Sequence, residues 1–221
     1  GVRYLIPEGK VMKEILSVGF PAIIMQAVGS FLTYGVNVIF GTLSASAVTA
    51  YGVYYKIQQF AFFAAFGMNN AMIPVIAFNY GSGDKERVRA GIRWGMIDTL
   101  VIMGVCLVVL EVCASQIVGI FALTQQTLTL CTRAVRTIAL GYLFAGANIA
   151  YQGVFQALGR GVPSMALCLV RQLLAALPLA WLFTLLPNPE VWCWAAFPVA
   201  EGIGLLVALV QRKRILPDVL T

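Results

Sequence analysis

Long apolar runs follow one another along the whole chain, with short polar segments between them. Six of these runs are long enough to cross the hydrocarbon core of a bilayer, which takes about 20 helical residues. They cover residues 15–43, 47–78, 88–121, 129–158, 162–186 and 191–210. Because backbone N–H and C=O groups need internal partners in lipid, each run is expected to be an α-helix. The pattern predicts an all-α, polytopic membrane helix bundle with six transmembrane helices.

The polar segments at the two ends of the chain divide it into three expected parts. Residues 1–14 are interpreted as a cytoplasmic linker, 15–211 as one transmembrane unit and 212–221 as a cytoplasmic tail. A chain that begins at Gly1 is expected to be a piece of a longer protein.

Basic residues predict the orientation in the membrane. Lys and Arg occur in the segment 81–91, around Arg160 and at both ends of the chain, whereas the segments 42–47, 122–126 and 187–190 have none. Since positive charge marks the cytoplasmic side, we expect a multi-pass protein of the cell (inner) membrane with both ends in the cytoplasm. Only Arg133 and Arg136, at the outer end of the fourth run, go against this rule.

Composition excludes several classes of protein. The 221 residues are 60% hydrophobic and 11% charged, whereas a soluble domain averages about 45–50% apolar and 25% charged residues. The net charge of +6 comes from residues that flank apolar runs, so no nucleic-acid partner is expected. There is no histidine, the five cysteines show no metal-binding spacing, and the known hydrolase and nucleotide-binding motifs are missing. We therefore predict neither an enzyme nor a bound cofactor or metal, apart from Na⁺ or H⁺ as a coupling ion.

Three charged residues lie inside apolar runs at similar depth: Asp98, Arg171 and Glu201. A charge in the bilayer centre costs at least about 2.5–3.5 kcal/mol, so these side chains are expected to pair or to line a watery path. We select them as candidates for ion coupling. Arg171 and Glu201 could instead form a static ion pair, and Asp98 could complete a triad with them or titrate alone as a proton carrier.

Polar and aromatic side chains recur every three or four residues in the first, second and fourth runs, which places each set on one helix face. Such faces could line a cavity for a solute, or their amides could join helices by hydrogen bonds. The residues selected as cavity candidates are Gln26, Thr33, Tyr34, Asn37, Tyr55, Lys56, Gln59, Phe63, Asn70, Asn148 and Gln152.

Prolines accompany two of the buried charges. Pro198 precedes Glu201 by three residues, and Pro178 follows Arg171 by seven. A proline inside a helix removes a hydrogen bond, so kinks are expected in the fifth and sixth helices. Broken helices near charges in mid-membrane are typical of sites that open alternately to each side.

Several short motifs resemble one family. They are Val18–Ala22, Gly67–Asp84, Phe155–Gly159, Val170–Leu174 and Phe197–Glu201, and the run Pro74-x4-Asn-Tyr-Gly-Ser-Gly-Asp84 is the most specific. In these motifs the chain is similar to the multidrug and toxic compound extrusion (MATE) transporters, in particular to their bacterial multidrug-efflux branch. The resemblance covers nearly the whole chain.

The resemblance implies a C-terminal six-helix lobe whose partner is the N-terminal six-helix lobe of the same transporter. It implies a secondary multidrug efflux antiporter, which exports cationic amphipathic compounds by rocker-switch alternating access, coupled to Na⁺ or H⁺ entry. Sodium-coupled relatives place acids in the helices that correspond to the first and fourth here, where this sequence offers only Asn37 and Asn148. The coupling ion therefore stays open.

Two other functions fit part of the pattern. A lipid-linked oligosaccharide flippase of the same superfamily would need a strongly cationic cavity, for which only Arg171 and Lys56 are placed. A non-transporting membrane scaffold would have no use for three buried charges. Drug export is the preferred hypothesis.

Overall fold

The computed structural model describes residues 9–220, with side chains at all of these positions except 14, 15, 17, 18 and 218–220. The first eight residues of the predicted linker lie outside this range, and α1 already begins at Gly9. All regular structure within the described range is helical, which confirms the predicted fold class. Five helices are long and apolar enough to cross a membrane, and a bent pair makes a sixth span.

The first three spans are uninterrupted helices: α1 (Gly9–Gly41), α2 (Ala45–Gly81) and α3 (Lys85–Gly119). In each of the two tight turns, a capping residue marks where the next helix begins. Ser44 caps α2 by accepting a hydrogen bond from the N–H of Ala47, and Asp84 caps α3 by accepting one from the N–H of Arg87. Gly83 takes a φ of +76° before the second cap, a conformation that suits glycine.

The fourth span, predicted as one helix over 129–158, is broken. It consists of α4 (Gln125–Ala139) and α5 (Tyr142–Ala157), which are bent by 51°. Gly141 stands at the bend, where a Cβ would lie only 2.8 Å from the Cα of Pro198. A glycine therefore lets the backbone of the bend approach the last helix closely.

The fifth span contains a wider helical turn in place of a simple kink. It runs through α6 (Gly161–Leu169), the π-helical segment η2 (Val170–Ala176) and α7 (Leu177–Phe183). Pro178 has no N–H to offer the carbonyl of Leu174, four residues earlier. A π-helix, with its i→i+5 pattern, is a known response to such a break in the α-helical ladder.

The sixth span consists of α8 (Pro189–Trp192), η3 (Cys193–Ala195) and α9 (Ala196–Leu220), so it continues through most of the predicted tail. Pro198, where a kink was predicted, lies in the first turn of α9, directly after the 3₁₀ turn η3. The first four N–H groups of a helix have no partner within the helix, so a proline there breaks no bond.

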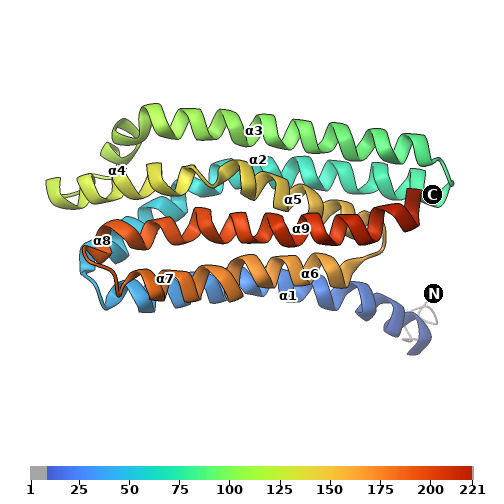
Figure 1. The fold of residues 1–221 in the computed structure, drawn as a ribbon, viewed down its shortest axis with the longest axis horizontal. Helices are drawn as coiled ribbons and strands as arrows, with labels where there is room; N and C mark the ends of the chain where they lie inside the picture. The colour runs from blue at the N-terminus through green and yellow to red at the C-terminus, as the bar shows by residue number, and fades with distance from the viewer. Residues whose placement is uncertain (1–8, 221) are drawn as a thin grey trace, which may run out of the picture.

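The spans run roughly antiparallel, and the N- and C-terminal ends lie at the same end of the bundle (Figure 1). A chain that crosses a membrane six times must have its two ends on the same side. Helix α5 is buried along almost its whole length and packs against α2, α3 and α9. Large apolar side chains on the outer face of α3 are exposed instead, as expected for contact with lipid: Val101, Val105, Val108 and Val112.

Candidate functional site

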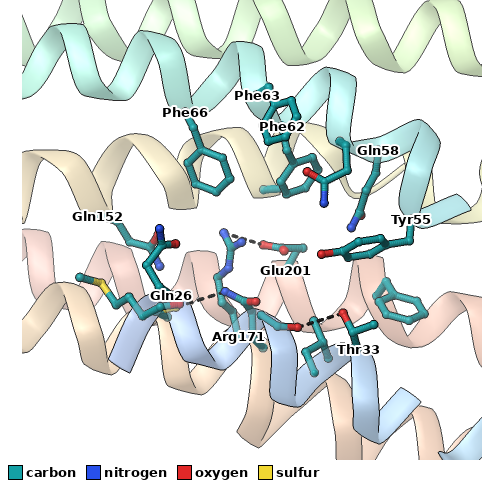
Figure 2. Close-up of a pocket in the computed structure, with 18 of the residues that line it drawn as sticks. Gln26, Thr33, Tyr55, Gln58, Phe62, Phe63, Phe66, Gln152, Arg171 and Glu201 are labelled. Atoms are coloured by element: carbon teal, nitrogen blue, oxygen red, sulfur yellow. Dashed lines mark hydrogen bonds and ion pairs between the residues drawn. The ribbon is translucent and has the colours of Figure 1, made fainter. Parts of the chain in front are cut away.

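A cavity of about 640 Å³ opens along the inner faces of α1, α2, α5, η2 and α9. Figure 2 shows side chains from α2 facing those of α1 across this space, with Arg171 and Glu201 between them. Its lining combines amides, aromatic rings and one ion pair.

Most of the predicted site residues line this cavity. From the cavity candidates these are Gln26, Thr33, Tyr55, Gln59, Phe63, Asn70 and Gln152, and from the ion-coupling candidates Arg171 and Glu201. Residues from five separate spans are thereby brought into one site. In the first, second and fourth runs, these polar positions lie on helix faces that point into the bundle.

Four cavity candidates lie outside the lining. Tyr34 is 72% exposed on α1, and Lys56 is exposed on α2. The Asn37 amide donates to the Thr33 carbonyl at 2.9 Å, which ties it to its own helix. Asn148 is fully buried behind the cavity wall.

Asp98 is also separated from the other two buried charges. It is exposed on α3, a helix that contributes no residue to the cavity. The expected triad with Arg171 and Glu201 is therefore not formed. Similar depth along the sequence does not bring the three charges together, because α3 turns this position outward.

Arg171 and Glu201 form an ion pair at the cavity wall, with 3.4 Å between Nη1 and Oε2. The Arg171 side chain is 4% exposed and the Glu201 side chain 17%. The Asn148 amide donates to Glu201 twice, at 2.8 Å to Oε2 and at 2.9 Å to the backbone oxygen. A buried charge pair needs such extra hydrogen bonds to offset its desolvation, so Asn148 supports the acid from behind.

The π-helical turn sets the position of the arginine. Arg171 is the second residue of η2, and π-helical turns occur often at functional sites. Arg171 Nε and Nη1 are buried without a hydrogen-bond partner among the described residues. The charge of the guanidinium is balanced by the ion pair that its Nη1 forms with Glu201.

Aromatic rings form the other wall. Tyr51 stacks on Phe197 with 5.9 Å between ring centroids, and Phe62 meets Tyr142 edge to face at 5.6 Å. These rings and those of Tyr54, Tyr55, Phe63 and Phe66 all line the cavity. Aromatic faces of this kind attract organic cations.

The lining also contains Ser30, Phe66 and Gln156, which lie on the same predicted helix faces, and four residues that the sequence analysis missed: Gln58, Phe62, Asn69 and Gln172. The spacing of Tyr55, Gln58, Gln59, Phe62, Phe66 and Asn69 follows the i, i+3, i+4, i+7 pattern of one broad helix face. That pattern was available in the sequence and would have identified the α2 residues. Gln172 lies in the π-helical turn, where the α-helical spacing no longer holds, so this pattern could not identify it as a lining residue.

The sequence model of one protein family, described as MatE, matches residues 21–182. The chain belongs to the MatE family. This confirms the resemblance noted from the motifs, and together with the apolar helices it makes this a multi-pass membrane protein.

Two curated relatives share the family. The multidrug export protein MepA of Staphylococcus haemolyticus (strain JCSC1435) is 28% identical over 160 residues, which cover 72% of this chain and 35% of that protein. MepA of Staphylococcus aureus (strain bovine RF122 / ET3-1) is 23% identical over 221 residues, covering 98% of this chain and 48% of that protein. The chain thus spans about half the length of the Staphylococcus aureus relative and about a third of the length of the Staphylococcus haemolyticus relative.

Solved structures show the same fold. A crystal structure of a MATE protein in complex with MaL6 superposes with a TM-score of 0.89 at 17% sequence identity. The match covers 99% of this chain and 50% of that one. The six-span bundle described above therefore corresponds in fold to one half of a MATE protein.

Proposed function

We propose that this chain forms the C-terminal lobe of a secondary multidrug efflux antiporter and works together with an N-terminal six-helix lobe. The observation that carries the proposal is the cavity itself, where an ion pair, several amides and an aromatic wall meet on the inner faces of the bundle. Relatives described as multidrug export proteins, and the match to half of a MATE structure, support the same conclusion.

The cargo we propose is a cationic amphipathic compound. Its charge would lie over the faces of rings such as Tyr55 and Phe63, since cation–π contacts contribute about 0.5–2 kcal/mol each. The amide of Gln26 or Gln152 would accept or donate a hydrogen bond. The lining thus combines aromatic surface for the apolar part of such a compound with polar groups that can orient it.

Glu201 is the residue we propose for ion coupling, because it is the acid that lines the cavity. Na⁺ or H⁺ at this carboxylate would weaken its attraction to Arg171 and its hydrogen bond from Asn148. Arg171 lies on the π-helical turn, so a change in the pair would act directly on the broken fifth span. The ion must bind one conformation better than the other, since equal binding shifts no equilibrium.

The proposal includes an orientation, with both ends of this segment in the cytoplasm of a cell whose inner membrane holds the protein. It rests on the basic segments at the end of the bundle where the two ends lie.

The test is dye efflux from cells that express the full-length transporter, with the Na⁺ and H⁺ gradients collapsed separately. Loss of ethidium efflux with one gradient only would establish an antiporter and name its ion. Efflux that persists without either gradient, or no efflux at all, would contradict the proposal.

A flippase for a lipid-linked oligosaccharide has less support. The cavity's arginine is paired with an acid, and Lys56 lies outside the lining. The cationic surface that a pyrophosphate group needs is therefore not assembled by the described residues of this lobe.

A further inference from the structure

A groove outside the cavity combines an apolar lining with one basic side chain. It has a volume of about 640 Å³ and lies between the first half of α1 and the start of α6, at the end of the bundle where the chain's two ends lie (Figure 1). Its apolar surface includes Leu16, Phe20, Val162 and Met165. Lys13 is the one charged residue among the described residues that line it. Such a surface fits a ligand that has an apolar part and a negative charge.

The groove lies on a side of α1 that faces away from the cavity. Its α1 residues include Lys13, Leu16 and Phe20, whereas those of the cavity include Gln26 and Gly29. At 3.6 residues per turn, these two sets point to different sides of the helix. Leu16 is 54% exposed and Phe20 is 60% exposed, and such large exposed apolar side chains mark a surface that contacts a partner or lipid. The cavity side is the one proposed to meet the N-terminal lobe, so the groove side is left to the lipid.

Two basic residues lie in the groove or beside it. Lys13 is exposed, and its long side chain can reach the polar surface of the membrane while its methylene groups stay against apolar neighbours. A Cβ at Gly161 would lie 3.8 Å from Pro21 Cβ, so α6 begins directly beside the groove. Arg160, which precedes Gly161 in the chain, is exposed as well. Positive charge at the membrane surface attracts anionic lipids.

We propose that this groove binds one anionic phospholipid, such as a phosphatidylglycerol, from the adjacent leaflet. Its acyl chains would lie against Leu16, Phe20 and Val162, and its phosphate would meet the ammonium group of Lys13. A zwitterionic lipid offers the same chains without a net negative charge, so Lys13 selects the lipid by charge. The site is separate from the cavity, and the proposal therefore goes beyond drug export.

A matched pair of lipids tests the preference for charge. We would add dioleoylphosphatidylglycerol or dioleoylphosphatidylcholine to the delipidated full-length transporter in detergent. Native mass spectrometry would then give the dissociation constant of the first bound lipid. The two lipids have the same acyl chains, and only phosphatidylglycerol has a net negative charge. One contact with a lysine at the membrane surface predicts that phosphatidylglycerol binds about 5-fold more tightly.

Two variants and their controls locate the bound lipid. Lys13→Gln is expected to bring the two dissociation constants within about 2-fold of each other. Lys213→Gln should keep the preference, because Lys213 is exposed at the same end of the bundle but lines no part of the groove. Phe20→Ala is expected to weaken binding of both lipids roughly 3- to 10-fold, since it removes apolar contact with the acyl chains. Phe31→Ala is its control, because Phe31 is exposed on α1 outside the groove. All four side chains are exposed, so these substitutions should leave the fold intact.

Equal affinity of the wild-type transporter for the two lipids would overturn the proposal. Binding of neither lipid would also overturn it and would show that another part of the protein covers the groove. A preference for phosphatidylglycerol that survives in Lys13→Gln, or that Lys213→Gln removes to the same extent, would show attraction by the basic surface as a whole. Equal losses in Phe20→Ala and Phe31→Ala would place the acyl chains elsewhere, and either result would overturn the groove as the site. None of these outcomes bears on drug export, which the dye-efflux test decides separately.

Discussion

Gly204 on α9 faces Arg171 so closely that a Cβ at Gly204 would lie 2.8 Å from the Cβ of Arg171 and 2.9 Å from Asn148 Nδ2. The absence of a side chain at this position lets the arginine and the asparagine approach Glu201 from two different helices. The ion pair therefore depends on close packing of side chains against Gly204 as well as on charge.

Gly204→Ala is expected to displace Arg171 or Asn148 and to lower dye efflux strongly, because overpacking of this kind costs about 1–3 kcal/mol. Gly202→Ala is the matched control, since the nearest atom to a Cβ there is Phe144 Cδ2 at 4.0 Å. Efflux per molecule of transporter at the membrane, compared between the two variants, checks this. Similar efflux in both would show that close packing at Gly204 is not required.

Glu201→Gln is expected to abolish dye efflux while the protein still reaches the membrane. It also leaves the Arg171 charge without its acid partner, and breaking a buried pair typically costs about 3–5 kcal/mol. We therefore expect a lower thermal stability in detergent. The double variant Arg171→Met with Glu201→Gln should regain most of that stability and remain inactive. Full drug resistance in Glu201→Gln would exclude Glu201 as the coupling residue.

Asp98→Asn is expected to leave dye efflux and its dependence on the ion gradient within about 2-fold of the wild type. The reason is the outward position of Asp98 on α3, away from the cavity, where a surface change typically has little effect. Efflux assays with each gradient collapsed provide the measurement. A loss of gradient dependence in this variant would contradict the prediction and show that Asp98 takes part in ion coupling.

Tyr55→Ala is expected to weaken binding of a quaternary ammonium dye by roughly 3- to 30-fold, the range given by one cation–π contact. Tyr55 lines the cavity, whereas Tyr34 is exposed on the outer part of α1 and lines no part of it. Tyr34→Ala is therefore the control and should bind the dye nearly as the wild type does. Fluorescence titration of the purified transporter compares the two. Equal losses would show that the ring of Tyr55 has no special role.

The sequence by itself determined the number of spans, the all-helical fold and the relative position of the two ends. Lipid offers no hydrogen bonds to the backbone, so each apolar run of sufficient length must be a helix. It also predicted the polar inner faces of α1, α2 and α5, because an amide such as Gln26 or Gln152 avoids lipid. A pair between Arg171 and Glu201 was one of the arrangements that the sequence left open, since two opposite charges in an apolar bundle gain by pairing.

Only the tertiary structure decided which of these residues meet. The sequence could not show the 51° bend at Gly141, the π-helical turn around Arg171, or the outward position of Asp98. The close approach of Asn69 to Gly153 was equally hidden. In a soluble protein the polar face of a helix identifies the outside, but lipid and the bundle interior are both apolar. The rotation of each helix is then set by close packing at small residues, which depends on its neighbours in space.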